Sequence, residues 1–240
     1  MLSLQNTLDE QTRPGELFKS LKEDDLLCTA CGHLCKLRPG QRGICKVRFN
    51  SNGILLVPFQ YAAGIQNDPI EKKPFFHAIP GSRALSFGML GCDFRCAYCQ
   101  NWFTSQSIKD DASTTKSVPV SAKEICEQAI SKNSKVVVST YNEPLITSEW
   151  AKEVFEEAKR KNLMTAYVSN GHGTPEVLEY ISPWIDLMKI DLKSFSQKEY
   201  RRLGGSLEAV LETIRSVHEM GVWLELVTLL IPGYNDSDKE

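Results

Sequence analysis

The sequence has neither a long apolar run nor an excess of charge of one sign. Its 28 Lys and Arg residues stand against 30 Asp and Glu residues, which gives a formal charge of −2. Coating a nucleic acid or lying on an anionic lipid surface needs concentrated positive charge, so both function classes are excluded. No run approaches the ~18 apolar residues of a membrane-spanning helix, and residues 1–19 carry acids and a proline where a signal peptide is apolar. We therefore expect a cytoplasmic protein without a membrane partner.

Three common catalytic motifs are also missing. The sequence contains no phosphate-binding GxxxxGK, no zinc-binding HExxH and no GxSxG nucleophile turn. The composition is otherwise that of a folded domain with a sizeable core, with 42% hydrophobic and 24% charged residues.

Cysteine is more abundant than a reducing cytosol explains, since eight are present. Thiols stay unpaired in that compartment, so clustered cysteines indicate a metal or a reaction. Cys126 stands alone in a helical pattern, where we expect it to be buried. The two groups are Cys28, Cys31, Cys35 and Cys45, and Cys92, Cys96 and Cys99.

The chain divides into two regions near Ser82. Residues 1–82 predict a small, loop-rich, metal-binding region, with a strand over 54–65 that Pro58 interrupts and an irregular connection over 67–82. Residues 83–240 alternate short apolar runs with amphipathic stretches, which predicts an α/β fold with parallel strands covered by helices. The apolar runs are 84–90, 135–140, 163–169, 185–192 and 222–231, and the helical stretches are 121–132, 148–161, 174–182 and 196–220.

The five strands are too few for a closed eight-strand barrel, which needs about 250 residues, so we expect a partial parallel (βα) barrel. Its active face is expected where the strands end, because the βα loops converge there. The five strand ends read GCDFRCAYCQNW, TYNEP, SNGHG, DLKS and IPGYND.

Cys92, Cys96 and Cys99 follow the first of these strands with the spacing Cys-x3-Cys-x2-Cys. A loop of this kind can wrap one inorganic cluster, donate three thiolates and leave one iron open. A zinc knuckle or buried free thiols are the alternatives, although a structural zinc site needs a fourth ligand close by.

Tyr98 directly precedes the last of these cysteines, and the motif resembles the signature of the radical S-adenosylmethionine (SAM) superfamily. The sequence is further similar to the radical SAM enzymes of the AmmeMemoRadiSam system, relatives of pyruvate formate-lyase activating enzymes. The resemblance runs from about residue 28 to the end. The segments that carry it are CTACGHLCKL, GQRGICKVR, DPIEKKPFFHAIPGS, GCDFRCAYCQNW, TYNEP, SNGH and IDLMKIDLKSF.

The resemblance implies a 4Fe-4S cluster on Cys92, Cys96 and Cys99, with SAM chelated at the open iron. Reductive cleavage would give methionine and a 5′-deoxyadenosyl radical that takes hydrogen from a substrate, which the resemblance does not name. The implied electron donor is a flavodoxin or ferredoxin. The family's partial barrel has a sixth strand, and this chain stops at Glu240 before it, so we expect a truncated form or a loss of that portion.

The resemblance also implies a SAM site at the other strand ends. Asn142 and Glu143 match the second-strand motif, in which the acid meets the SAM amino group, although Tyr141 and Asn142 stand where glycines are usual. A helix N-terminal acid is the alternative for Glu143. Ser169 and Asn170 match the site of the ribose.

After the fourth strand, Asp191 and Lys193 alternate with apolar residues, and by resemblance Lys193 approaches the SAM carboxylate or ribose. A strand-end salt bridge is the alternative. The backbone around Tyr98, together with residues 231–234, resembles the adenine site. His172 is a further candidate for contact with substrate or SAM, and Lys72 and Lys73 could face the active opening.

The first cysteine group offers four soft ligands, from Cys28 to Cys45, which suit an all-thiolate zinc site or a second iron–sulfur cluster. We favour a structural metal slightly. Two rival functions stay open beside a radical SAM enzyme: a glycyl-radical activase acting on a partner protein, and a non-catalytic iron–sulfur electron carrier or scaffold. SAM binding discriminates the carrier from the enzymes.

Overall fold

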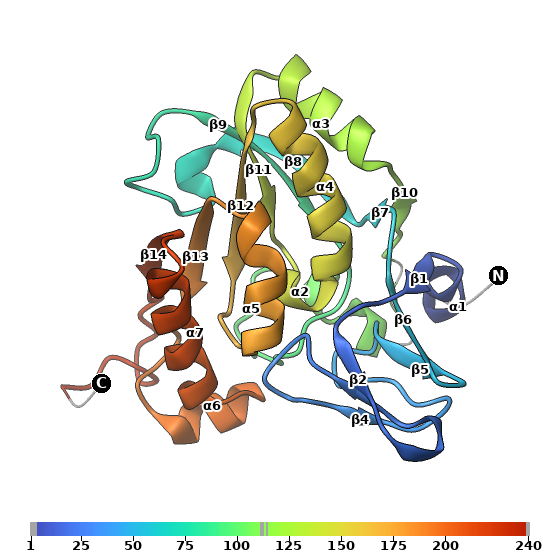
Figure 1. Ribbon diagram of the computed structural model, residues 1–240. Coiled ribbons are helices and arrows are strands. Elements are labelled where there is room, and N and C mark those ends of the chain that lie inside the picture. The colour runs from blue at the N-terminus through green and yellow to red at the C-terminus, as the bar shows by residue number, and fades with distance from the viewer. Residues whose placement is uncertain (1–3, 111–112, 114, 239–240) are drawn as a thin grey trace.

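The computed structural model describes residues 4–110, 113 and 115–238, and a six-stranded sheet lies at its centre (Figure 1). The strand order is β14-β13-β12-β11-β9-β8. Five of these strands run parallel, as the sequence predicts, whereas β8 pairs antiparallel with β9. The strands are β8 Gly64–Pro69, β9 Arg83–Gly88, β11 Ser134–Ser139, β12 Met164–Ser169, β13 Leu187–Asp191 and β14 Trp223–Val227.

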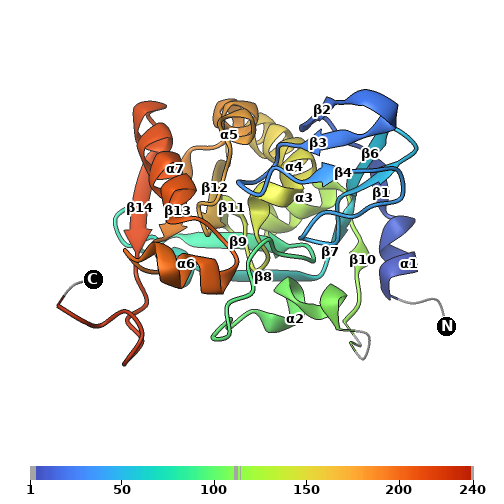
Figure 2. The ribbon, with the colours of Figure 1, turned by 90° about the horizontal axis from the view of Figure 1, so that it is seen from below.

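Helices cover one face of this sheet (Figures 1 and 2). Two of them begin at capping side chains: Ser121 forms a capping box with Glu124, and the Thr174 hydroxyl accepts a hydrogen bond from the Val177 amide. No helix in the described ranges has the length and apolar character needed to cross a membrane. The covering helices are α3 Ala122–Ser131, α4 Ser148–Arg160, α5 Pro175–Ile181 and α7 Leu207–Glu219.

The predicted single helical stretch over 196–220 is wrong. The structure has two helices there, α6 Gln197–Leu203 and α7, separated at Gly204 and Gly205. Gly204 has a φ of 90°, a left-handed conformation that ends a helix and favours glycine. A Cβ on Gly205 would lie 2.2 Å from the ring of Phe94, so the break also admits the loop that follows β9.

The other face of the sheet is covered by residues 70–78, which we call the floor segment. It begins with the 3-10 turn η2 (Ile70–Lys72) and falls within the predicted irregular connection 67–82, whose first residues instead complete β8. The Glu225 carboxylate on β14 accepts hydrogen bonds from three consecutive floor amides at 2.8–3.1 Å. The apolar contact joins Ile70, Phe75 and Ala78 to Ala84, Val136, Val138, Ala166 and Leu187.

The N-terminal part contains more strand than the loop-rich prediction allows. Two three-stranded antiparallel sheets form, β1-β6-β5 and β2-β3-β4, and β7 pairs with β10. Their strands are two to five residues long, too short for an alternating pattern to be read from sequence. The elements are α1 Leu4–Asp9, β1 Thr12–Pro14, β2 Phe18–Ser20, η1 Lys22–Asp24, β3 Leu26–Cys28, β4 Lys36–Leu37, β5 Phe49–Ser51, β6 Ile54–Pro58, β7 Tyr61–Ala62 and β10 Val118–Pro119.

The boundary at residue 82 stays a prediction. The strand β8 lies before this boundary, yet it is hydrogen-bonded to β9, so the N-terminal part contributes a strand to the central sheet. The outer ends of the two predicted regions, residues 1–3 and 239–240, lie outside the described residues, and Glu240 is among them.

A buried ion pair joins the N-terminal part to helix α4. Both terminal nitrogens of Arg48 lie 2.7 Å from the carboxylate oxygens of Glu149, and the two side chains are 1% and 0% exposed. Arg48 also donates to the Ile146 carbonyl, and Glu149 accepts from the Leu17 amide. Burial alone would raise the pKa of Glu149, but the charge of Arg48 and its hydrogen bonds lower it. The pair is therefore ionised and bidentate.

We predict that Arg48→Met lowers the free energy of unfolding by about 3–5 kcal/mol, because it leaves the buried Glu149 carboxylate without a partner. Denaturant unfolding at neutral pH measures this, with Arg215→Met as the control. Arg215 forms an exposed pair with Glu212, whose removal costs less than about 1 kcal/mol. Equal losses in the two variants would contradict the prediction.

The pH dependence gives a second check. Because folding lowers the pKa of Glu149, its stabilisation is complete above the pKa of the unfolded state and is lost as the pH falls through the folded pKa. The stability gap between wild type and Arg48→Met should therefore narrow on acidification.

Candidate active site

Ten of the predicted site residues line two adjoining cavities at the carboxyl ends of the parallel strands. Tyr98 lines the larger, of about 720 Å³, which reaches down to the floor segment. The smaller, of about 100 Å³, is lined by the other nine: Cys92, Cys96, Cys99, Asn142, Glu143, Ser169, Asn170, Asp191 and Lys193.

Cys92, Cys96 and Cys99 lie on the loop between β9 and the short helix α2 (Trp102–Ser105). Backbone groups of this loop are held from outside it: the Arg95 amide donates to the Leu203 carbonyl, and Lys109, at the end of η3 (Ser107–Lys109), donates to the Cys92 carbonyl at 3.0 Å. Burial raises the pKa of the Cys96 thiol to about 11 and that of Cys92 well above its ordinary value. Three soft donors facing one small cavity fit an iron–sulfur cluster better than a hard cation.

Asp93 is a fully buried carboxylate that sequence reasoning missed. It accepts hydrogen bonds from the Asn170 side-chain amide and the His172 Nδ1, each at 2.8 Å. Burial would raise its pKa, but these bonds and the charge of His172 lower it. The place of this acid directly after Cys92 is the only signal in the sequence. His172 is thus buried against Asp93 and lines neither cavity, so the expected contact of His172 with substrate or SAM is not supported.

Glu143 is the centre of a second hydrogen-bond network. Its carboxylate accepts from the Ser169 hydroxyl at 2.6 Å, from the Asn170 amide at 2.8 Å and from the Leu145 amide at 3.1 Å. The last bond caps the 3-10 turn η4 (Pro144–Thr147), which confirms that Glu143 is an acid at a helix N-terminus. Glu143 lines the smaller cavity as well. Burial and the negative charge of Asp93 raise the pKa of Glu143 to about 8.

Asn142 and Tyr141 shape the turn that precedes Glu143. The Asn142 side chain accepts from the Met89 amide and donates to the Glu143 carbonyl, which fixes its orientation. Tyr141 has a φ of 73°, the left-handed conformation that glycine adopts most easily. Its phenol oxygen lies 2.8 Å from the Ser86 hydroxyl and 2.9 Å from the Lys73 ammonium. The turn therefore has a glycine-like backbone although its residues are not glycines.

Lys189, Asp191 and Lys193 project to one side of β13 and its extension. The Asp191 carboxylate contacts both ammonium groups, that of Lys193 at 3.3 Å. Burial lowers the pKa of Lys189, whereas for Lys193 the charge of Asp191 outweighs burial and raises it. Lys189 was not among the predicted site residues, although its spacing of two from Asp191 was the available signal.

Tyr98, which lines the larger cavity, contacts a second aromatic side chain. The rings of Tyr98 and Tyr234 meet edge to face with centroids 5.8 Å apart. The structure thus brings together the two segments that the resemblance assigns to adenine.

The first cysteine group is partly gathered: the Cys28 amide donates to the Cys35 carbonyl at 2.9 Å, although no three of its sulfurs lie within 4.8 Å of one another among the described residues. Cys28, Cys31 and Cys45 are buried, and a Cβ placed on Gly43 would lie 3.7 Å from both the Cys35 and Cys45 sulfurs. The Cys28 sulfur accepts from Arg48 Nε at 3.3 Å. Cys31 also lies close to Asp93 and His172. Its sulfur, an oxygen of Asp93 and a nitrogen of His172 all lie within 4.8 Å of one another. The two cysteine groups are therefore neighbours across Asp93.

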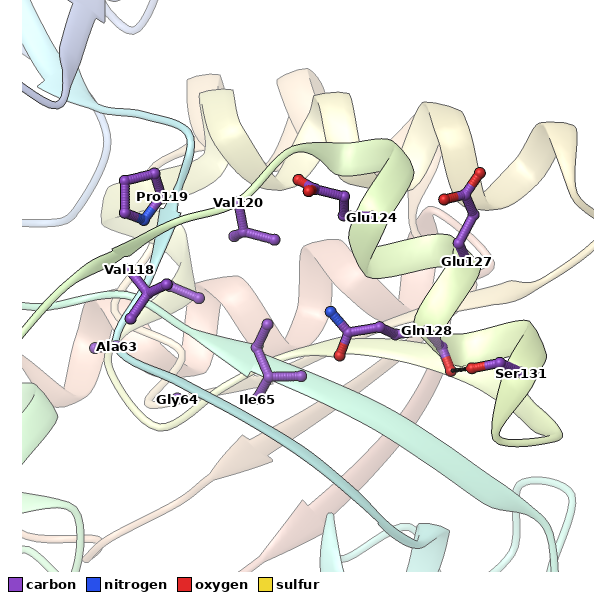
Figure 3. A pocket seen from close by; sticks show the side chains of 11 residues that line it. Ala63, Gly64, Ile65, Val118, Pro119, Val120, Glu124, Glu127, Gln128 and Ser131 are labelled. Carbon is purple, nitrogen blue, oxygen red and sulfur yellow. Dashed lines mark hydrogen bonds between the residues drawn. The ribbon is translucent and has the colours of Figure 1, made fainter.

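A separate pocket of about 630 Å³ lies between β8, β10 and α3 (Figure 3). Figure 3 shows Ile65, Val118 and Val120 on its wall, with Glu124 and Gln128 on the helix side. The Glu124 carboxylate already caps α3. No cysteine lines this pocket.

Gly88 controls how closely β9 approaches the turn at Tyr141. A Cβ there would lie 2.5 Å from the Thr140 carbonyl oxygen and 2.8 Å from the Tyr141 side chain. We predict that Gly88→Ala lowers the free energy of unfolding by roughly 1–3 kcal/mol. Gly64, its partner on β8, has open space, and Gly64→Ala should be neutral or stabilising by up to about 1 kcal/mol. Thermal or denaturant unfolding measures both, and a neutral Gly88→Ala would refute the close approach.

Comparison with known proteins identifies several relatives. An uncharacterised protein of Methanocaldococcus jannaschii is 33% identical over 226 residues, which cover 94% of this chain and 66% of that protein. The pyruvate formate-lyase-activating enzyme of Streptococcus mutans is 27% identical over 176 residues, covering 67% of this chain and 64% of that protein. The chain thus spans about two thirds of the length of these curated relatives.

A solved radical SAM methyltransferase from Sphaerobacter thermophilus is 15% identical, with a TM-score of 0.49, and covers 67% of this chain and 51% of that one. The family described as the Radical SAM superfamily matches residues 88–240, more than half of the chain. With its three loop cysteines gathered at the ends of parallel strands, the chain belongs to the radical SAM superfamily.

Proposed function

We propose that this protein is a radical SAM enzyme whose 4Fe-4S cluster is held by Cys92, Cys96 and Cys99, with the parallel sheet acting as a partial (βα) barrel. One observation carries the proposal: three thiols of a single loop share a small cavity with the polar ends of three strands, and this cavity adjoins a larger one. A purely electron-carrying cluster does not need such a polar set beside it. SAM binding is what this arrangement supports.

When bound, the cluster supplies the electron that splits SAM into methionine and a 5′-deoxyadenosyl radical. The residues of this chain bind and orient SAM. Glu143 accepts from the SAM ammonium group, and this cation would favour the charged carboxylate, which burial otherwise opposes. Lys193, which is held charged by Asp191, pairs with the SAM carboxylate.

The remaining predicted contacts follow the same strand ends. Ser169 and Asn170 stand at the ribose, and their bonds to Glu143 and Asp93 keep them in place. Tyr98 and Tyr234 lie at the adenine. The volume of about 720 Å³ lies in the range of small-molecule sites, and it supports the binding of a substrate beside SAM.

A second candidate is an activating enzyme that takes hydrogen from a partner protein. Relatives named as activating enzymes favour it, including the isethionate sulfite-lyase activating enzyme of Oleidesulfovibrio alaskensis, which is 26% identical over 101 residues. For either function the electron donor we propose is a flavodoxin or ferredoxin.

For Cys28, Cys31, Cys35 and Cys45 we propose a structural zinc ion. Three of the four thiols are buried and Cys35 is half-buried, and four soft sulfur donors suit tetrahedral coordination. Arg48 donates to the Cys28 sulfur and also forms the buried ion pair with Glu149. A structural metal is expected in such a place, next to an interaction that holds the N-terminal part against α4. A second iron–sulfur cluster is the alternative.

The proposed function predicts that SAM is cleaved and that cleavage depends on the loop thiols. After anaerobic reconstitution with iron and sulfide, the wild type incubated with SAM and dithionite should release 5′-deoxyadenosine. Cys96→Ala should reduce this product to background, because the cluster loses one of three ligands. Cys126→Ala, at a buried cysteine of α3 outside both groups, should retain it. A loaded wild-type cluster that yields no product would overturn the proposal.

The zinc proposal predicts about one zinc per chain in protein purified without added metal. Replacing Cys45 by Ser should remove most of this zinc and leave the iron bound at the other group. Elemental analysis measures both metals, with Cys126→Ser as the matched control. Iron and sulfide well beyond one cluster per chain, lost in Cys45→Ser, would show a second cluster instead.

A further inference from the structure

The larger cavity is bordered by two groups of the same composition, each with two lysines on one aspartate. The first is Lys189, Asp191 and Lys193 on β13 and its extension. The second joins Asp68 of β8 to Lys72 and Lys73 of the floor segment, at 3.2 and 2.9 Å. All six residues line the cavity of about 720 Å³.

Each group carries one more positive than negative charge. The lysines add four positive charges to this cavity wall and the two aspartates remove two. A second excess charge close to the first is costly unless an anion compensates it, because like charges repel more strongly in a partly buried site. In the proposed function the carboxylate of SAM meets the first group, at Lys193. The second group is left without a counter-ion.

The side chain of Lys73 is held in place by its surroundings. Its side chain is 5% exposed, although lysine is rarely buried without a specific partner. Its ammonium donates to Asp68 and to the Tyr141 phenol oxygen, each at 2.9 Å. An ammonium has three donors, and no acceptor for the third occurs in the described part of the chain. Tyr141, which orients Lys73, belongs to the same strained turn that leads to Glu143.

Lys72 is the neighbour of Lys73 in the chain and, unlike Lys73, is exposed to solvent. Its side chain is 69% exposed and contacts only the second carboxylate oxygen of Asp68. The pair thus offers one fixed and one adjustable ammonium to the same cavity. A carboxylate or phosphate group with several acceptor oxygens can use both.

We propose that Lys72 and Lys73 form a subsite for an anionic group of the substrate, a carboxylate or a phosphate ester. This inference rests on the proposed function, in which SAM occupies the strand ends and the substrate lies beside it. The floor segment therefore contributes to substrate specificity as well as closing the sheet. Tyr141 and Asp68 act as positioning residues for Lys73.

The test is calorimetric titration of the reconstituted protein, saturated with SAM, with inorganic phosphate and separately with acetate as probes. We expect one probe or both to bind wild type, and Lys73→Gln to weaken that binding about tenfold, since it removes a charged donor. Lys73→Arg should restore most of the affinity. The control Lys123→Gln, at a 72% exposed lysine of α3, should bind like wild type.

Binding of phosphate alone assigns a phosphate ester, binding of acetate alone assigns a carboxylate, and binding of both supports the shared anion chemistry. If Lys73→Gln fails to fold, the variant Lys72→Gln, at an exposed position, still tests the subsite. It should weaken anion binding about threefold. Absence of binding to wild type, or unchanged affinity in the Lys72 and Lys73 variants, would overturn the subsite. So would loss of SAM binding in Lys73→Gln, because the anion would then be that of SAM itself.

Release of 5′-deoxyadenosine is measured on the same samples. Normal release with no anion binding refutes the subsite alone. Failure of release in wild type refutes the proposed function, whatever the titration shows.

Discussion

The buried pair of Arg48 and Glu149 is the interaction on which the relation between the two halves of the molecule depends. Two charges with almost no solvent contact are tolerated only when every polar atom is satisfied, and here backbone groups from both halves complete the pair. Arg48 lies three residues after Cys45, and Glu149 lies in the first turn of α4. The pair therefore fixes the cysteine-bearing strands against the helical layer.

Asp93 performs a related role between the two cysteine groups. It follows a cysteine of the cluster loop, bonds to two residues at the end of β12 and reaches the neighbourhood of Cys31. His172, which is held by Asp93, leaves no room for a side chain at residue 32, because a Cβ on Gly32 would lie 2.6 Å from the His172 ring. The two cysteine-bearing segments and the end of β12 are thus packed around the Asp93 carboxylate.

Much of this arrangement can be predicted from the sequence. The parallel strands appear as short runs of buried apolar residues, such as Val136 to Val138, between amphipathic helices with clear caps. The cysteine loop is recognisable from its spacing alone. The pairing of β8 and the course of the floor segment cannot be predicted from the sequence. Pro69 and Pro74 indicate irregular structure, and the partners of Glu225 are backbone amides, which no side-chain pattern reveals. Lys73 and Asp93 gain their importance only from residues distant in the chain.

The floor segment also affects the order in which parts of the molecule can fold. Its amides bond to a carboxylate 147–149 residues further along the chain, one of the longest loops that this fold must close. Contacts of such high separation form late, since the entropy of closing the loop is lost before the contact compensates it. The base of the large cavity is therefore set only after β14 has been synthesised and has joined the sheet. A nascent chain that already contains both cysteine groups therefore still lacks the base of the large cavity.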